Sequence, residues 1–413
     1  MKESFIRFLR FTEKYTKTDM LYLFKGGFWL STGQFVSSAS ALITSIVFAN
    51  LLAPEIFGIY KYIISIMGLL AITTLAGMDS AITQAVSRGF EGTLVPAIKT
   101  KMKWGLLGSG FSILIAIYYY IAGNTTISLS FAVVALFMPF IESFDMYNSL
   151  LLGKKYFHTQ TIYNSIKKII SLIAIILTVW LSKNIYLILF VYLSSIILPN
   201  LYFLLKTVRS YKKNENIDKD AIPYGKRLSA IYILSLITTE LDKILVFQYV
   251  GPVYLVIYSL ASAPIDQIKG LLKNVNSLAI SQFSQKTLEE IKKNIWNKVR
   301  LLAIGTSIII SIYIILAPLF FSLFFPRYIS AVPYSQVLAV SLIPIVLAGF
   351  IYTALEAQKA QDELYKYNTY SNIMSIVILL PLVYYFGIWG AVLARLLTRS
   401  ATFVYSIHLM KRA

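Results

Sequence analysis

Long apolar runs, separated by short polar segments, account for most of the sequence. A helix of about 20 apolar residues spans the hydrocarbon core of a bilayer. Irregular segments are not tolerated there, because their backbone N–H and C=O groups would have no hydrogen-bond partners. Only 14% of the 413 residues are charged and 57% are hydrophobic, which is untypical of a soluble chain of this length. We therefore predict an all-α polytopic membrane protein with about twelve transmembrane helices. Their expected positions are 24–51, 57–84, 104–122, 127–152, 162–181, 185–205, 228–249, 253–282, 299–325, 333–358, 367–386 and 388–410.

Basic residues are concentrated in alternate connections between these runs. An excess of Lys and Arg retains loops in the cytoplasm. We therefore attribute the net charge of +19 to the basic cytoplasmic loops and not to a nucleic-acid-binding surface. Both termini are expected to be cytoplasmic. In this interpretation Lys101 and Lys167 belong to the basic connections. Residues 5–17 alternate apolar with basic side chains, which is typical of a helix lying on the inner membrane surface.

The two halves of the chain match at a constant offset of 198 residues. Pro54 corresponds to Pro252, and the Ala-Ile-Thr-Gln sequence at 81–84 corresponds to Ala-Ile-Ser-Gln at 279–282. Six spans per copy would give both copies the same orientation, which predicts a pseudo-twofold axis along the membrane normal. The predicted parts are an N-terminal six-helix lobe at 1–205, a charged cytoplasmic linker at 206–227 and a C-terminal six-helix lobe at 228–413.

Residues 51–60, Leu-Leu-Ala-Pro-Glu-Ile-Phe-Gly-Ile-Tyr, resemble the L-x-P-E-x-F/Y-G-x-Y pattern of the polysaccharide transporters, the lipid-linked oligosaccharide (O-antigen type) flippases. Gly251-Pro252 and Tyr258 resemble its counterpart in the second half, although Val256 stands where a second glycine would mirror Gly58. The resemblance covers the whole chain. It implies the fold of the multidrug/oligosaccharidyl-lipid/polysaccharide exporter superfamily, in which two six-helix lobes alternate between inward-open and outward-open states.

The same resemblance implies a location and a cargo. The protein would be a flippase of the bacterial cytoplasmic (inner) membrane that turns an undecaprenyl-diphosphate-linked oligosaccharide from the cytoplasmic to the outer leaflet. Its expected partners are this lipid-linked glycan, membrane lipids and other glycan-assembly proteins.

Charged residues lie near the middle of several predicted spans, where ionisable groups usually face protein or a wet cavity. A diphosphate cannot enter hydrocarbon without cationic partners. We therefore expect five cations to contact the diphosphate or the sugar: Lys243, Lys269, Lys273, Arg395 and Arg399. The alternative is neutralisation along one helix, because Glu240 and Asp266 each precede a lysine by three residues. Lys273 could instead extend to the headgroups.

Acidic residues at similar depth are candidates for ion coupling: Glu142, Asp145, Glu240, Asp242 and Asp266. A carboxyl group at this depth can bind H⁺ or Na⁺ as the lobes move. The alternative is structural pairing with a basic residue of a neighbouring helix. No other cofactor and no metal site are expected, because the chain has no Cys and its two histidines, His158 and His408, lie far apart.

Other functions fit the sequence less well. A drug exporter of the same fold would need an acidic and aromatic cavity. A membrane glycan polymerase or ligase usually carries catalytic residues on a large external loop, whereas the external segments here, such as 123–126, are only a few residues long. A non-transporting scaffold would not need charges at mid-membrane depth. The sequence shows no nucleophile with an adjacent base and no glycine-rich phosphate loop, so no catalytic residues and no enzymatic activity are predicted.

Overall fold

The computed structural model describes residues 20–283, 288–358 and 360–412, and every regular element within these ranges is helical. This confirms the prediction of an all-α protein. The elements are α2 (Met20–Leu51), α3 (Pro54–Leu70), η1 (Ala71–Thr74), α4 (Gly77–Ser87), η2 (Glu91–Thr93), α5 (Leu94–Ile121), α6 (Thr125–Phe144), α7 (Tyr147–Gly153), α8 (Phe157–Leu181), α9 (Ile185–Tyr211), α10 (Ala221–Tyr249), α11 (Pro252–Phe283), α12 (Leu288–Phe324), η3 (Pro326–Tyr328), α13 (Ala331–Val340), α14 (Leu342–Ala357) and α15 (Gln361–Arg412).

In the described ranges, nine helical stretches are long and apolar enough to cross a bilayer. The protein is therefore a multi-pass membrane protein. The 52-residue α15 counts once among the nine, although Gly387 with φ +56° interrupts it between the two spans predicted there. The charge-bearing α10 and α11 are not among the nine. A total of twelve spans stays a prediction.

Three predicted spans are interrupted by turns that hydropathy did not reveal. The span at 57–84 breaks after η1, where Leu75 adopts a left-handed conformation with φ +56°. The span at 127–152 is divided between α6 and α7 at Asp145, and the span at 333–358 between α13 and α14 at Ser341. Hydropathy averaged over about 19 residues cannot resolve a break of one or two residues.

Helix limits keep the offset seen in the sequence. α2 ends at Leu51 and α10 at Tyr249, while α3 begins at Pro54 and α11 at Pro252. Both pairs are 198 residues apart. Proline suits the first turn of a helix because its missing N–H has no partner there in any case. Beyond this point the halves differ, since α3 ends at Leu70 whereas α11 continues to Phe283.

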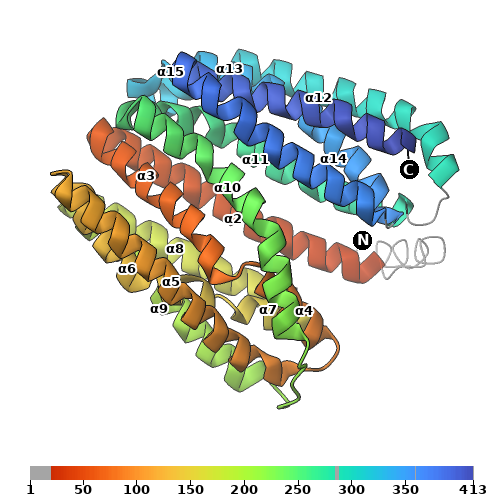
Figure 1. The fold of residues 1–413 in the computed structure, drawn as a ribbon, viewed down its shortest axis with the longest axis horizontal. Helices are drawn as coiled ribbons and strands as arrows, with labels where there is room; N and C mark the ends of the chain where they lie inside the picture. Colours follow the sequence, from red (N-terminus) through yellow and green to blue (C-terminus); the bar gives the residue numbers. More distant parts are fainter. Residues whose placement is uncertain (1–19, 284–287, 359, 413) are drawn as a thin grey trace, which may run out of the picture. The chain divides into compact units, whose positions relative to one another are not determined.

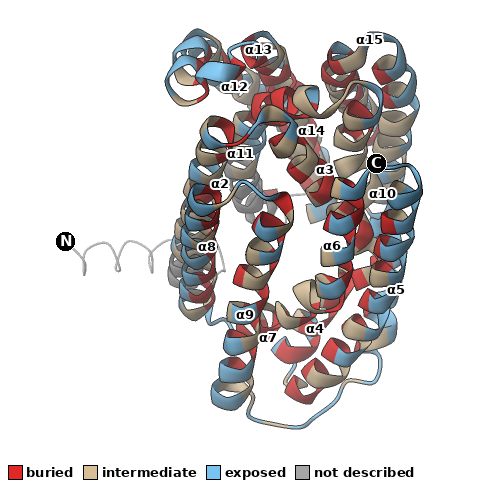
Figure 2. Ribbon diagram, turned by 90° about the vertical axis from the view of Figure 1, so that its left-hand side faces the viewer, coloured by how far each residue is buried: buried red, intermediate tan, exposed pale blue. Residues whose placement is uncertain are grey.

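The chain divides into two compact units, Met1–Ile237 and Thr238–Ala413. In the first unit α5 packs on α6, α6 on α9, and α8 on both α2 and α9 (Figure 1). Its core includes Met146, Tyr147 and Leu150, all fully buried. The outer face of α5 is exposed (pale blue in Figure 2) and carries large apolar residues such as Leu106 and Leu114, which suits contact with lipid.

The polar segment 212–220, between α9 and α10, is attached to the first unit through Glu91. Glu91 is only 5% exposed. Its carboxylate accepts a hydrogen bond from the backbone N–H of Lys213 and pairs with Lys154 Nζ at 2.6 Å. Because a buried charge is costly unless paired, these partners fix the segment against η2.

Two further contacts hold the other end of this segment. The Asp218 carboxylate pairs with Arg88 at 2.5 Å, and its backbone N–H donates to Thr93 Oγ1 at 2.8 Å. A Cβ added to Gly92 would lie 2.3 Å from the carbonyl oxygen of Glu215. Only glycine permits this close approach of two backbones. The predicted lobe limits at 206–227 stay a prediction, with α9 and α10 covering both ends of that range.

In the second unit, α11 packs on α13 and α14, and α14 packs on α15. The two arms of α15 fold back at Gly387, so that Thr402 Oγ1 donates to Ser371 Oγ at 3.2 Å across 31 residues. A Cβ on Gly390 would lie 1.8 Å from the carbonyl oxygen of Leu382. Glycine is therefore required where the second arm leaves the turn.

Candidate functional site

A cavity of about 830 Å³ lies in the second unit among α10, α11, α14 and α15. Four of the five cations predicted to contact the cargo line it, together with two of the predicted carboxylates: Lys243, Lys269, Arg395, Arg399, Asp242 and Asp266. The side chain of the fifth cation, Lys273, lies outside the described residues. Arg395 and Arg399 face the same cavity because residues four apart lie on one face of a helix.

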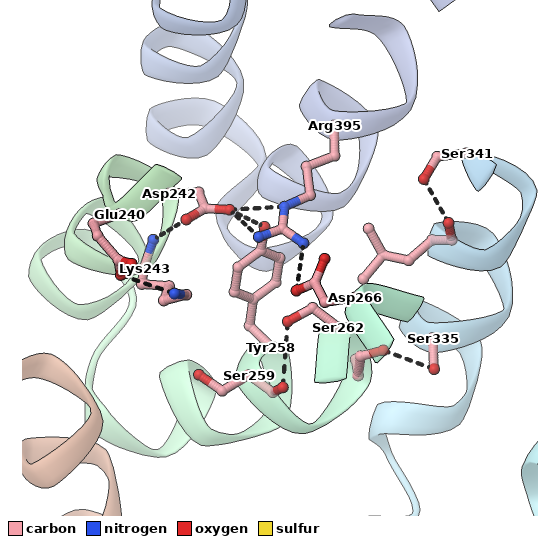
Figure 3. A network of polar contacts seen from close by, with 12 residues as sticks. Glu240, Asp242, Lys243, Tyr258, Ser259, Ser262, Asp266, Ser335, Ser341 and Arg395 are labelled. Carbon is pink, nitrogen blue, oxygen red and sulfur yellow. Dashed lines mark hydrogen bonds and ion pairs between the residues drawn. The ribbon is translucent and has the colours of Figure 1, made fainter. Parts of the chain in front are cut away.

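Arg395 is held by the most buried carboxylate of the cavity (Figure 3). Oδ2 of Asp242 accepts from Arg395 Nε at 2.8 Å and from the Tyr258 hydroxyl at 2.6 Å, and it lies 2.7 Å from Arg395 Nη2. The backbone N–H of Lys243 donates to Oδ1 at 2.7 Å. The guanidinium also lies 5.2 Å from the centre of the Tyr258 ring, a cation–π distance. Both oxygens of Asp242 are therefore occupied by structural partners.

Asp266 is bound more loosely. Its carboxylate is 44% exposed and lies 3.6 Å from Arg395 Nη1 and 3.9 Å from Arg399 Nη2. These separations allow electrostatic attraction but are too long for hydrogen bonds. Within the described part of the chain, the buried Nη1 of Arg395 makes no hydrogen bond. Arg399 Nη1 donates to Ser341 Oγ at 2.6 Å. Asp266 therefore lies within ion-pair distance of both guanidinium groups without a hydrogen bond to either, while Arg395 is also paired with Asp242.

The predicted pairing along α10 is present. Lys243 Nζ donates to Glu240 at 2.8 Å, with side chains 25% and 18% exposed. On α11, Asp266 lies at ion-pair distance from the two arginines of α15. This agrees with the alternative of pairing with a neighbouring helix, although the sequence did not identify which basic residues it would contact.

Polar and aromatic residues also line the cavity. Thr238 Oγ1 donates to Asn372 Oδ1 at 2.9 Å, and Asn368 Nδ2 donates to the Tyr352 hydroxyl at 3.3 Å. The rings of Tyr352 and Tyr367 are 5.0 Å apart. All five residues line the cavity. Amide groups and aromatic faces are what sugar hydroxyls and sugar rings bind, so the cavity presents cationic and glycan-compatible surfaces together.

The remaining predicted carboxylates, Glu142 and Asp145, lie in the first unit and are paired across helices. Lys101 of α5 has a fully buried side chain and lies 3.0 Å from Asp79 and 4.0 Å from Glu142. Lys167 of α8 pairs with Asp145 at 2.6 Å. The structural alternative considered for these carboxylates is thus present in the structure.

This cluster corrects the interpretation of Lys101 and Lys167 as residues of basic connections. Both lie within helices, because α5 begins at Leu94 and α8 at Phe157. The predicted span at 104–122 began after Lys101 because polar residues in the first turns of α5 lower the local hydropathy, whereas Lys167 already lay inside the predicted span at 162–181. The sequence shows no pattern that would have paired Lys101 with its partners. In the described ranges, no group of three His, Cys, Asp or Glu side chains is arranged to hold a metal ion.

Comparisons with known proteins agree with this fold. A family model described as "Polysaccharide biosynthesis protein" matches residues 23–277, more than half of the chain. Comparison with curated proteins gives no match. Among solved structures, the inward closed conformation of the lipid II flippase MurJ is similar with a TM-score of 0.70 and 15% identity, covering 92% of this chain and 87% of that one.

Two other solved structures are similar over nearly their whole length. A MATE protein in complex with MaD5 has a TM-score of 0.64 and 12% identity, covering 94% of this chain and 96% of that one. A transporter of the MOP superfamily from Pyrococcus furiosus, described as having a binding pocket of reverse polarity, has a TM-score of 0.61 and 12% identity, with 95% of each chain covered. The chain thus belongs to the polysaccharide biosynthesis protein family expected from its sequence and has a fold similar to that of the MOP-superfamily transporters.

Proposed function

We propose that this protein is a flippase that moves an undecaprenyl-diphosphate-linked oligosaccharide of the O-antigen type from the cytoplasmic to the outer leaflet of the bacterial inner membrane. The observation that carries the proposal is the lining of the cavity in the second unit, where the described residues include four cations and two carboxylates. Its volume of about 830 Å³ falls in the range of about 300–1,000 Å³ of small-molecule sites. The diphosphate and its first sugar would occupy it while the lipid tail stays in the bilayer.

The loose position of Asp266 suggests how the site is loaded and emptied. A phosphate oxygen can form charge-assisted hydrogen bonds to Arg395 Nη1 and to Arg399, which are stronger than the present contacts at 3.6 and 3.9 Å. When the cargo leaves, Asp266 again balances both guanidinium groups. The empty cavity then avoids the cost of unpaired cations during its return.

Lys243 and Lys269 would serve the second phosphate, and the amide and tyrosine wall around Asn368 and Asn372 would contact the first sugar. Asp242 has a different part in this proposal. Its oxygens are occupied by Arg395, Tyr258 and the Lys243 backbone, so it positions Arg395 and does not itself exchange ions.

The proposal includes coupling to an ion in the first unit. The three carboxylates Asp79, Glu142 and Asp145 form their ion pairs with two lysines, Lys101 and Lys167. Glu142 has the longest ion pair, 4.0 Å to Lys101. We assign to it the uptake of one H⁺, with Na⁺ as the alternative. Alternating access between duplicated six-helix lobes, with both termini cytoplasmic, completes the proposal.

The site can be tested with Arg399→Ala and Lys269→Ala, using Arg300→Ala on the exposed face of α12 as the matched control. The probe is undecaprenyl diphosphate, titrated onto the purified protein in nanodiscs. Loss of one hydrogen bond to a charged group, about 1.5–3 kcal/mol, predicts an affinity about 10- to 100-fold lower for Arg399→Ala. Arg300→Ala should bind like the wild type.

The same variants should be expressed in cells that lack the chromosomal gene, with protein levels matched. Arg399→Ala should leave lipid-linked glycan accumulating on the cytoplasmic leaflet. Wild-type binding and export by both cavity variants would reject the assignment of the site. Efflux of lipophilic cations without glycan export would favour a drug exporter instead.

A further inference from the structure

A groove of about 540 Å³ runs between α8 and α9 of the first unit and shares no residue with the cationic cavity. Its walls are two stripes of side chains spaced four residues apart, so each stripe lies on one helix face. The stripes consist of Ile162, Ile166 and Ile170 on α8 and of Leu198, Tyr202 and Lys206 on α9. The apolar members are between 36% and 64% exposed. The groove is therefore an open apolar surface on a membrane-spanning pair of helices.

Small residues form the floor of the groove. Ser195 Oγ donates to Ser171 Oγ at 3.0 Å, which brings the two helices close together beneath the stripes. Pro199, one turn further along α9, has no N–H, so the carbonyl of Ser195 lacks its usual helical donor. The larger side chains of the two stripes form the walls on either side of these small residues.

Lys206 closes one end of the groove, near the basic end of α9. Its ammonium nitrogen lies 5.4 Å from the centre of the Tyr163 ring and 5.9 Å from that of Tyr202. Tyr163 is fixed by stacking on Phe203 at 4.2 Å. Among the residues that the structure describes, no carboxylate forms an ion pair with Lys206. Lys206, in contact with the rings of Tyr163 and Tyr202, thus lies at one end of the apolar groove.

We propose that this groove is a binding site for an anionic glycerophospholipid of the surrounding membrane. One acyl chain lies between the two stripes, and the phosphate contacts Lys206 and the hydroxyl of Tyr202, which is exposed. From Ser194 to Lys206 the groove extends about 18 Å at 1.5 Å per residue, close to the roughly 15 Å depth of one leaflet. Tyr and Lys residues commonly lie at the membrane interface, where they contact lipid headgroups.

The prediction can be measured by native mass spectrometry of the purified full-length protein, titrated with phosphatidylglycerol or with phosphatidylcholine. The wild type should retain phosphatidylglycerol preferentially. Lys206→Ala should lower this retention about fivefold, the effect of one lysine at an anionic membrane surface, and leave phosphatidylcholine unchanged. Leu198→Trp should reduce retention of both lipids by filling the groove. The matched control is Lys103→Ala, an exposed lysine of α5 outside the groove.

Four results would overturn the proposal. The first is a wild-type preference in Lys206→Ala, and the second is an equal loss in Lys103→Ala, which would indicate a general effect of surface charge. The third is unchanged retention of both lipids by Leu198→Trp. The fourth is displacement of phosphatidylglycerol by equimolar undecaprenyl phosphate, which would reassign the groove to a polyprenyl lipid.

Discussion

Replacing Arg395 by Ala tests whether the buried pair beneath the cavity determines the stability of the second unit. The side chains of Arg395 and Asp242 are 16% and 6% exposed, so neither charge is well hydrated. After the substitution, Asp242 Oδ2 keeps only the Tyr258 hydroxyl at 2.6 Å. Removing one partner of a buried ion pair costs about 3–5 kcal/mol because the other charge stays buried and unpaired.

For a unit of this size, about 2–4 °C of melting temperature corresponds to each kcal/mol. Arg395→Ala should therefore melt about 6–20 °C below the wild type. The comparison is Lys243→Ala, which breaks the more exposed pair with Glu240. Pairs of this kind contribute about 0.3–0.5 kcal/mol, so its melting temperature should fall by no more than about 2 °C.

The measurement is the loss of the monodisperse peak in size-exclusion chromatography after heating the detergent-purified protein. A third variant, Arg395→Met with Asp242→Asn, removes both charges and should recover most of the lost stability. The reasoning is refuted if Arg395→Ala melts within about 2 °C of the wild type. It is also refuted if the double variant melts as low as Arg395→Ala.

Three further substitutions have distinct expected outcomes. Gly390→Ala would place a Cβ 1.8 Å from the Leu382 carbonyl oxygen, so we expect a loss above about 3 kcal/mol and aggregation on purification; a wild-type elution profile would contradict the turn. Arg88→Ala breaks a pair in which the arginine side chain is 60% exposed; the heating assay should show a loss below about 1 kcal/mol. Glu142→Gln should remove the dependence of glycan export on an imposed pH gradient, and an unchanged dependence would exclude Glu142 as the coupling group.

Hydropathy and charge placement predicted the helical class and four cations that the structure brings into one cavity. Lys243, Lys269, Arg395 and Arg399 were identifiable because ionisable groups are rare in apolar runs. Apart from Glu240, which pairs with Lys243 as predicted, the partners of these cations were not identifiable. Hydropathy gives the position of a residue along its helix but not the neighbouring helix that it faces, so the contacts of Asp266 with α15 could not be inferred.

The ends of the helices were the second feature that the sequence did not predict. The third turn of α5 contains Lys101, which sequence analysis placed in a connection because the apolar run begins later. A lysine that is neutralised by a carboxylate of another helix can continue a helix into the interior, as Lys101 does with Asp79. The charged residues of such pairs lower the hydropathy averaged along the sequence. Sequence windows therefore underestimate helix length at these positions.

The attachment of segment 212–220 has a mechanical consequence. Glu91 and Thr93 fix this segment to the first unit, and Gly77 N–H donates to Ser229 Oγ at 3.0 Å, which fixes the start of α10 as well. The boundary between the units, after Ile237, falls inside α10. The connection from the first unit to the second is therefore continuous helical backbone and not a flexible linker.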